Sequence, residues 1–404
     1  MYLKYNLRGV VGKDLNEKEI RRFAKNIVSY IYVNKHKPCV VIGKDNRVTS
    51  DYILNFLNSI LLKSGIEVSV LGTTSTPEVA YLTKKFKYTL GIMITASHNS
   101  YEYNGFKCFN VLGEMVDIDK QVIRKVRLVN YKKLIDAKTF KEVYLRELKN
   151  KLNPNNIKCI FDCANGTMVD IVRKIFPRNQ IIGNNTSGED INQSCGSQCL
   201  DRLINMCKKY KKIGFAFDGD GDRVIAIDEN GSVVDGDKII YILATQKLGF
   251  GDKVVGTQIS SLGLEISLRR LGVSLIRERV GAKYVARRIK KENVILGGET
   301  CGHIFLSSAI SDGVAIVIEL LNILNRTGLT FEKLLSGYKQ TFKLTKDFKV
   351  DNLIECDEYE KIDNNVRVVV RRSGTEDVVR VFVEGENIDA VKLKFEEVVK
   401  SIAS

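Results

Sequence analysis

The chain has 404 residues, of which 63 are Lys or Arg, 48 are Asp or Glu, three are His, nine are Cys and none is Trp. A hydrophobic fraction of 44% and a charged fraction of 27% exclude an intrinsically disordered or collagen-like chain, and at roughly 100–200 residues per domain the length predicts two to four domains. The net charge of +15 is compatible with nucleic acid, an acidic membrane or an anionic small molecule as partner, and it does not choose among them.

Targeting signals and cysteine usage together predict a cytoplasmic protein. The first residues, MYLKYNLRGVVGKDL, contain no apolar stretch of the kind found in a signal peptide. No run of about 18 uncharged apolar residues occurs, so we expect no membrane-spanning helix. The nine cysteines form no tight framework, and three histidines give little support to a zinc site. We therefore expect reduced, structural thiols.

The first part of the chain alternates predicted strands with predicted helices. Residues 38–45 are a short apolar run that ends in polar residues, which is typical of a buried strand. Residues 50–65 have apolar positions at helical spacing, and Ser50 is the expected N-cap. The elements predicted next are a strand over 66–74, a helix over 76–86 and a strand over 88–97. This order predicts a sheet with helical crossovers.

The alternation of strand and helix begins again twice. KCIFDCANG (158–166) opens with a strand, and residues 214–237 give two strands and a turn. A third unit begins near residue 252 and continues through helices to about residue 340. The last part differs, because strands followed by a final helix over 387–402 predict a small α+β domain. The sequence thus predicts an α/β protein of three similar units and a different C-terminal unit.

The strongest local signal is the run Asp218-Gly-Asp220-Gly-Asp222-Arg223. Three carboxylates at alternate positions converge only in a tight turn, which the two intervening glycines permit, and hard oxygen ligands favour Mg²⁺ or Ca²⁺. An EF-hand also fits, with Glu229 at loop position 12, but Arg223 stands where that loop requires Gly and both flanks read as strands. A solvated acidic turn is the other alternative. We favour a metal-binding loop.

A second candidate loop is TASHNSYEYNGFK, residues 95–107. The strand before it delivers Ser97 and His98 onto a loop rich in turn-forming residues. Ser97 is a candidate nucleophile, and Lys107 is a cation near whatever Ser97 binds. Taken alone, the segment favours an ordinary polar loop, and the absence of a G-x-S-x-G elbow argues against a hydrolase.

A third candidate loop is Gly297-Gly-Glu-Thr-Cys-Gly-His303. Its glycines let the backbone approach a ligand, and Glu299, Thr300 and His303 offer hydrogen-bonding groups suited to sugar hydroxyls. The alternative is a tight turn without a ligand.

A fourth candidate loop follows the strand VRVVV near the C-terminus. Ser373, Thr375 and the backbone around Gly374 offer an anion-binding nest, to which Arg371 and Arg380 add bidentate donors. A hairpin turn with solvated arginines is the alternative.

The four loops together are more informative than any one of them. Two of the three histidines lie in these loops. Together the loops supply metal ligands, a nucleophile, hydrogen-bonding groups for hydroxyls and a nest that binds phosphate. This set predicts a site for a phosphorylated sugar in a cleft between domains.

Across essentially its whole length the chain resembles the α-D-phosphohexomutase family. The motifs TASHN, DGDGDR, GGE-x-x-GH and R-x-SGTE occur in the order of that family. DCANG, NxxCGS, VGTQISSLGLE and VGAKYV are most similar to its phosphoglucosamine mutase branch, whereas LKYNLRGVVGKDL is closer to its phosphomannomutase/phosphoglucomutase branch.

This resemblance implies four domains around a central active-site cleft. The three related α/β mixed-sheet domains are expected over 1–152 (the serine loop), 153–251 (the metal loop) and 252–343 (the sugar loop). A small α+β C-terminal domain that binds phosphate is expected over 344–404.

The resemblance also implies a mechanism. Ser97 is carried as phosphoserine, and one Mg²⁺ is held by Asp218, Asp220, Asp222 and a phosphoserine oxygen. The enzyme moves a phosphoryl group between O6 and O1 of a hexosamine phosphate, converting glucosamine 6-phosphate to glucosamine 1-phosphate through a 1,6-bisphosphate. Phosphomannomutase/phosphoglucomutase activity is the alternative.

Residue roles follow from the same resemblance. Lys107 and His98 are the candidate general acid/base and charge partner, and Arg8 contacts the catalytic loop. The residues expected to bind substrate are Arg223, Lys283, Glu299, Thr300, His303, Arg371, Ser373, Gly374, Thr375 and Arg380. Ser100 and Cys301 depart from the residues usual in the family, which bears on specificity more than on reaction type.

Two other classes of protein are weighed against this interpretation. A basic nucleic-acid-binding protein is disfavoured, because the lysines are scattered and no nucleic-acid-binding motif occurs. A non-catalytic sugar-phosphate-binding protein is disfavoured by the intact Ser97 and aspartate trio. We expect a small-molecule hexose or hexosamine phosphate as partner, no nucleic acid, no membrane, and a monomer or homodimer.

Overall fold

A computed structural model describes residues 7–33, 37–118, 133–308, 310–349, 359–363, 366–372 and 378–403. The chain divides into two compact units, each described by itself below. The first unit is Met1–Val234 with Cys301–Thr330, and the second unit is Asp235–Thr300 with Phe331–Ser404. Within the described residues, no helix is both long and apolar enough to cross a membrane.

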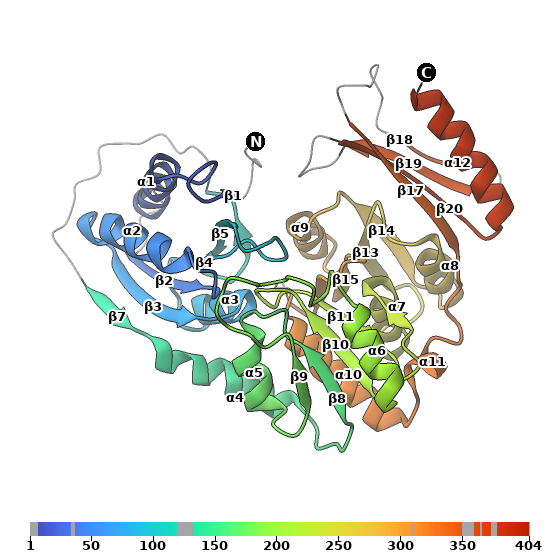
Figure 1. Ribbon diagram of the computed structural model, residues 1–404, viewed down its shortest axis with the longest axis horizontal. Coiled ribbons are helices and arrows are strands. Elements are labelled where there is room, and N and C mark those ends of the chain that lie inside the picture. The colour runs from blue at the N-terminus through green and yellow to red at the C-terminus, as the bar shows by residue number, and fades with distance from the viewer. Residues whose placement is uncertain are drawn as a thin grey trace. The chain divides into compact units, whose positions relative to one another are not determined.

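The first unit begins with a seven-stranded sheet in the order β1-β5-β4-β2-β3-β7, with β6 paired to β5 (Figure 1). Its strands are β1 (Arg8–Val10), β2 (Cys39–Lys44), β3 (Glu67–Thr73), β4 (Leu90–Ile94), β5 (Tyr103–Asn110), β6 (Met115–Val116) and β7 (Leu134–Asp136). The helices of this part are α1 (Glu17–Val33), α2 (Ser50–Lys63), α3 (Thr76–Lys85), the 3₁₀ turn η1 (Lys138–Phe140) and α4 (Lys141–Lys151). Strands β2, β3, β4 and β7 are parallel, whereas β5 runs antiparallel to β4 and β1.

Helices cover both faces of this sheet because successive strand residues point to opposite sides. Val40 and Ile42 of β2 pack with α1 and α2, whereas Val41 of the same strand packs with Val79 and Leu82 of α3. Strands buried on both faces read as continuous apolar runs, which is why residues 38–45 were recognisable in the sequence.

The prediction of Ser50 as an N-cap is wrong. Thr49 precedes α2 and makes no capping bond with its side chain, and Ser50 is already helical. The Ser50 hydroxyl instead donates to Asp45 Oδ1 at 2.8 Å, in the loop between β2 and α2.

A second sheet of the first unit has five strands in the order β12-β11-β10-β8-β9. These are β8 (Cys159–Asp162), β9 (Gln180–Ile182), β10 (Ile213–Phe217), β11 (Val224–Ile227) and β12 (Val233–Val234). The accompanying helices are α5 (Met168–Ile175), α6 (Asp201–Tyr210) and α10 (Gly313–Thr327). The short strand β16 (Ile304–Leu306) also belongs to the first unit but not to this sheet. Leu203 and Cys207 of α6 pack on one face, and Phe161 stacks on Phe176 at the end of α5 on the other, with ring centroids 4.9 Å apart. Helix α4 contacts α3, α5 and α10, so it joins the two sheets of this unit.

The second unit contains a parallel sheet and an antiparallel sheet. Its elements are α7 (Gly236–Lys247), β13 (Lys253–Thr257), α8 (Leu262–Arg270), β14 (Ser274–Glu278), α9 (Ala282–Glu292), β15 (Leu296–Gly298), α11 (Phe331–Leu334), β17 (Phe342–Lys349), β18 (Tyr359–Asp363), β19 (Val366–Arg372), β20 (Val378–Gly385) and α12 (Ile388–Ala403). Strand β13 lies between β14 and β15. The second sheet has the order β17-β20-β19-β18, with α12 on one face (Figure 1).

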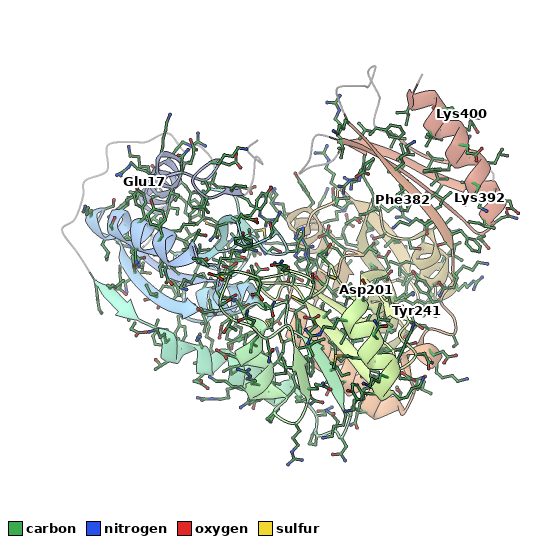
Figure 2. The ribbon with its side chains drawn as sticks, in the orientation of Figure 1. Glu17, Asp201, Tyr241, Phe382, Lys392 and Lys400 are labelled. Atoms are coloured by element: carbon green, nitrogen blue, oxygen red, sulfur yellow. The ribbon has the colours of Figure 1, made fainter. Side chains whose placement is uncertain are left out.

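The two faces of the C-terminal sheet differ in their chemistry. Alternate valines of β19 and β20 pack beneath α12, whose Lys392 and Lys400 lie on its exposed side (Figure 2). The other face carries Phe382 of β20 and the buried Arg367, whose guanidinium lies 5.6 Å from the Phe382 ring. The small α+β part predicted at the C-terminal end is thus present, as strands β17 to β20 and helix α12.

The α/β class predicted from the sequence is confirmed, with mixed sheets and a separate α+β part at the C-terminal end. The four domain boundaries stay a prediction. The structure groups α7 with residues of the second unit, whereas the predicted boundary at residue 251 places this helix in the preceding domain.

Candidate active site

The Ser97 loop begins where β4 ends. Ser97 is 1% exposed and has a φ of 55°, a left-handed backbone conformation that costs a residue other than Gly about 1–3 kcal/mol and persists only where its surroundings enforce it. Its N–H donates to Thr95 Oγ1 at 2.9 Å, and its Oγ donates to Asp218 Oδ2 at 2.7 Å. The strained turn therefore places the Ser97 hydroxyl against the aspartate loop.

The aspartate loop joins the antiparallel strands β10 and β11. Asp218, Asp220 and Asp222 are 0%, 0% and 3% exposed, and their candidate ligand oxygens lie within 4.8 Å of one another. Gly221, with a φ of 75°, makes the reversal that brings them together. The convergence predicted from the alternating aspartates is present.

The pKa values of two of these carboxylates shift in opposite directions: that of Asp218 is raised, whereas His303 and Lys107 outweigh burial at Asp222 and hold its pKa well below its usual range. Burial, followed by the charges of Asp220 and Asp222, raises the pKa of Asp218 to about 7. Lys107 Nζ on β5 lies 2.6 Å from Asp220 Oδ2 and 2.5 Å from Asp222 Oδ2. Burial alone would lower the pKa of Lys107, but these two carboxylates outweigh it and raise that pKa, so the ammonium stays charged.

The aspartate trio fits a hard divalent cation. Asp220 Oδ1 is buried and has no hydrogen-bond partner among the described residues, and the donor set consists only of carboxylate oxygens, which Mg²⁺ prefers.

His303 contacts the last aspartate of the loop, Asp222, and Arg223 contacts the first, Asp218. His303 Nε2 lies 2.8 Å from Asp222 Oδ1. Burial opposes its charge, but Asp222 outweighs burial and holds the pKa of His303 well above its usual range. The Arg223 N–H donates to Asp218 Oδ1 at 3.2 Å, and its Nε lies 3.6 Å from Asp218 Oδ2.

His98 differs from His303 because cations surround it. Burial, followed by the charges of Arg223 and Arg8, lowers the pKa of His98 to about 2, so its imidazole is neutral. Arg8 lies on β1, whose pairing with β5 brings it beside the Ser97 loop, and its Nη1 donates to Asn99 Oδ1 at 2.8 Å. The structure thus gathers every predicted site residue of the first unit around Ser97 and the aspartate loop.

Lys283, Glu299 and Thr300 are the predicted substrate-binding residues of the second unit that lie outside the predicted phosphate loop. Lys283 is buried in the first turn of α9. Glu299 is 4% exposed and accepts a hydrogen bond from Gly281 N at 2.8 Å, and the Thr300 hydroxyl donates to Asp237 Oδ2 at 3.0 Å. Their role stays a prediction.

The predicted phosphate loop is described in part. Arg371 of β19 and Arg380 of β20 face each other across the strand pair, and Arg380 Nε lies 3.2 Å from Asp347 Oδ2. Ser373, Gly374 and Thr375 lie outside the described residues.

Sequence reasoning missed several residues that support the two loops. Arg47 and Asn192 donate to backbone carbonyls of the Ser97 loop, the Thr76 hydroxyl donates to Asp220 Oδ2, and the Ser311 hydroxyl donates to the Asp222 carbonyl at 2.6 Å. One signal was available for Arg47. It follows β2, which is parallel to β4 and adjacent to it, so the loops after the two strands meet at one edge of the sheet.

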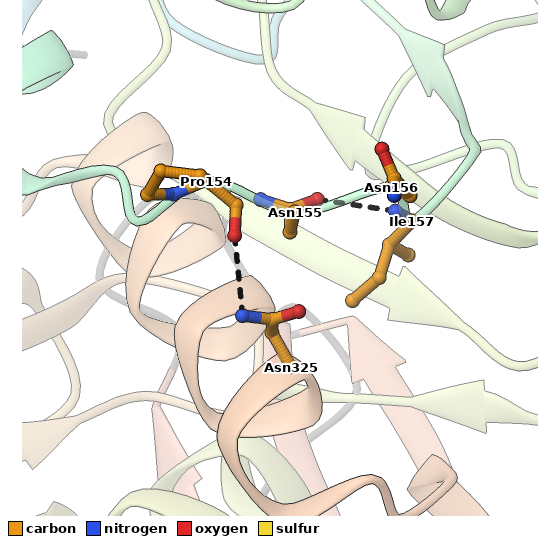
Figure 3. A pocket seen from close by; sticks show the side chains of 5 residues that line it. All are labelled: Pro154, Asn155, Asn156, Ile157 and Asn325. Atoms are coloured by element: carbon orange, nitrogen blue, oxygen red, sulfur yellow. Dashed lines mark hydrogen bonds between the residues drawn. The ribbon is translucent and has the colours of Figure 1, made fainter.

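A surface cavity of about 490 Å³ lies outside this constellation (Figure 3). Its lining residues are Pro154, Asn155, Asn156, Ile157 and Asn325. Asn325 Nδ2 donates to the Pro154 carbonyl at 3.3 Å. None of the lining side chains is charged, and the cavity contains no residue predicted to act in catalysis.

Comparison with known proteins identifies the family. Models described as phosphoglucomutase/phosphomannomutase alpha/beta/alpha domain I, alpha/beta/alpha domain III and C-terminal domain match residues 3–127, 235–341 and 343–401. The phosphoglucosamine mutase of Dictyoglomus turgidum is 36% identical over 416 residues, covering 94% of this chain and 93% of that protein. The phosphoglucosamine mutase of Acetivibrio thermocellus is 32% identical over 406 residues, covering 91% and 90%.

The fold is shared with a solved structure. The crystal structure of a phosphoglucomutase/phosphomannomutase family protein from Burkholderia thailandensis aligns with a TM-score of 0.83 at 20% identity, covering 99% of this chain and 97% of that chain. The chain therefore belongs to the phosphoglucomutase/phosphomannomutase family.

Proposed function

We propose that this chain is a phosphohexomutase that interconverts glucosamine 6-phosphate and glucosamine 1-phosphate through a phosphorylated Ser97. Relatives named phosphoglucosamine mutase, with identities such as 36% and 32% over more than nine-tenths of the chain, support the choice of sugar. The observation that carries the proposal is the Ser97 hydroxyl, buried and 2.7 Å from a carboxylate of a convergent aspartate trio.

The first transfer phosphorylates the substrate. The O1 hydroxyl of glucosamine 6-phosphate attacks the phosphorus of phospho-Ser97, so that the P–O1 bond forms, the P–Oγ bond breaks and the O1 proton leaves. We assign the exchange of this proton to the predicted acid/base and charge partners, Lys107 and His98. Burial and nearby cations lower the pKa of His98 and keep its imidazole neutral. The products are glucosamine 1,6-bisphosphate and an unphosphorylated Ser97.

The second transfer uses the same groups in reverse. The bisphosphate turns over in the site, Ser97 Oγ attacks the phosphorus at O6, and O6 recovers a proton as glucosamine 1-phosphate forms. Lys107, kept charged by two carboxylates, and Arg8, whose Nη1 holds Asn99 of the loop, add positive charge beside the transferring phosphoryl group.

Asp218, Asp220 and Asp222 would hold one Mg²⁺, which would supply positive charge to offset the charge of the phosphoryl group. The buried, unpartnered Asp220 Oδ1 and the raised pKa of Asp218 support this assignment.

The remaining substrate contacts come from the other candidate loops. We assign Glu299, Thr300 and His303 to the sugar hydroxyls in both orientations, with Arg223 and Lys283 as further contacts. The non-reacting phosphate is assigned to Arg371, Ser373, Gly374, Thr375 and Arg380, because paired arginines suit a dianionic phosphate.

The test is a coupled assay that compares glucosamine, glucose and mannose phosphates at matched concentration. We expect the highest kcat/KM with glucosamine 6-phosphate. A preference for glucose or mannose phosphate would assign the chain to the phosphomannomutase/phosphoglucomutase alternative, and turnover of none of the three would refute the mutase assignment.

A further inference from the structure

One buried arginine binds several carbonyls of the Ser97 loop. Arg47 is 1% exposed. Its Nη2 donates to the Ser97 carbonyl at 3.0 Å and to the Asn99 carbonyl at 2.8 Å, and its Nη1 donates to the carbonyls of Tyr103, at 3.0 Å, and of Ser100. Asp45 Oδ2, 2.9 Å from Arg47 Nε, balances the buried charge. The guanidinium therefore fixes the loop at both ends.

Asn192 binds two of the same carbonyls from the other sheet of the first unit. Its Nδ2 donates to the Ser97 carbonyl at 2.8 Å and to the Asn99 carbonyl at 3.0 Å. Asn192 lies in the loop between β9 and α6, and its own N–H donates to the Ala164 carbonyl at 2.8 Å. Arg47, from the loop after β2, and Asn192, from the loop after β9, thus both bind the two ends of the segment that carries Ser97 and His98.

The same contact reaches the aspartate loop. A Cβ built on Gly219 would lie 2.9 Å from Asn192 Nδ2 and 2.9 Å from the Ser97 carbonyl. Gly219 stands between Asp218 and Asp220, so the backbone of the aspartate loop, the amide of Asn192 and the backbone of Ser97 are in close approach. The amide of Asn192 thus lies at the junction that sets the distance between Ser97 and the aspartates.

We propose that Arg47 and Asn192 are positioning residues for phosphoryl transfer, holding Ser97 in its left-handed conformation with Oγ directed at Asp218. This inference rests on the proposed function. A φ of 55° at Ser97 needs enforcement by its surroundings, and these two side chains bind the carbonyl of the strained residue itself. Both donate to backbone, so they contribute geometry and not a reacting group.

Asn192→Gly removes the amide donor, and Arg47→Lys replaces the forked guanidinium by a single ammonium. The φ of 61° at Asn192 suits glycine, and lysine keeps the charge of Arg47 but loses the fork that reaches four carbonyls. Asn185→Ala is the matched control, because Asn185 lies in the same loop and its Nδ2 donates to Asp190 Oδ2 at 2.9 Å without touching the Ser97 loop.

We expect each test variant to lower kcat about 10- to 100-fold, since a displacement of about 1 Å in reacting groups has that order of effect. KM should stay within about twofold of wild type, and Asn185→Ala should leave both constants within about twofold. A kcat within about twofold of wild type in folded Asn192→Gly would overturn the proposal, and so would a rise in KM that accounts for the whole loss of kcat/KM. If Arg47→Lys does not fold, Asn192→Gly decides.

Amide hydrogen exchange gives a readout that does not need turnover. Peptides covering residues 95–105 should exchange faster in Asn192→Gly than in wild type or Asn185→Ala, with peptides of the second unit unchanged. Unchanged protection of residues 95–105 would refute the positioning role. A wild type that is inactive on all three sugar phosphates but shows this exchange pattern would refute the proposed function and leave the structural part of the inference intact.

Discussion

Gly166 tests how closely the aspartate loop must be held. A Cβ at this position would lie 2.3 Å from the Gly219 carbonyl oxygen and 2.7 Å from Gly219 Cα, whereas ordinary contact begins at 3.4 Å. Gly166→Ala must therefore displace backbone by about 1 Å, because no flexible side chain is present to move instead. The φ of Gly166 lies outside the left-handed region, so the effect is one of contact and not of backbone strain.

The displaced residue stands between two of the three aspartates. A shift of about 1 Å there should lower kcat roughly 100-fold, and overpacking of this kind should cost about 1–3 kcal/mol of stability. Steady-state kinetics and the thermal midpoint measure the two effects. Gly249→Ala is the control, since its Cβ would meet nothing within 4 Å. A Gly166→Ala enzyme with kcat within about twofold of wild type would refute the reasoning.

Three further predictions concern charge. Burial raises the pKa of Glu78 from 4.5 to about 7, so between those pH values the unfolded chain loses this proton first and stability falls as pH rises. Glu78→Gln should therefore be more stable than wild type at pH 8, by about 3 kcal/mol at 1.36 kcal/mol per pKa unit, and not at pH 4; equal thermal midpoints at pH 8 would contradict this. Arg371→Ala should raise KM for the sugar phosphate several-fold, and an unchanged KM would remove Arg371 from the site. Chelation of divalent cations should abolish turnover, with Mg²⁺ restoring it, and Asp220→Asn should weaken Mg²⁺ binding measured by calorimetry; undiminished binding would exclude Asp220 as a ligand.

Hydrophobic patterning was sufficient to predict much of the fold. The strand predicted over 38–45 is β2 (Cys39–Lys44), and the final helix predicted over 387–402 is α12 (Ile388–Ala403). Both elements could be predicted because the spacing of their apolar residues shows which side chains are buried. Ser50 was misread because a serine hydroxyl before an apolar run fits either a cap or a buried partner for Asp45, and only the tertiary structure decides between them.

The candidate site could be predicted where its residues have reactive or charged side chains. Ser97, Lys107 and the aspartates carry reactive or charged groups in distinctive local patterns, and the structure brings them together. Arg47 and Asn192 were missed because their partners are backbone carbonyls, which every residue has and no motif marks.

Net charge was the weakest guide to function. The excess of 15 positive charges suggested any polyanion, yet the most distinctive part of the site is acidic. The cations that matter are a few within the site, such as the buried Lys107 and the half-buried Arg8, whose position against the carboxylates and the Ser97 loop follows from strand pairing.

Phosphorus-31 NMR of purified protein mixed with glucosamine 6-phosphate and Mg²⁺ tests the central claim most directly, with Ser97→Ala measured in parallel. The account predicts that wild type produces the resonance of a phosphate at the anomeric carbon until equilibrium is reached, and that Ser97→Ala produces none. Interconversion at the wild-type rate by Ser97→Ala would contradict the phosphoserine mechanism.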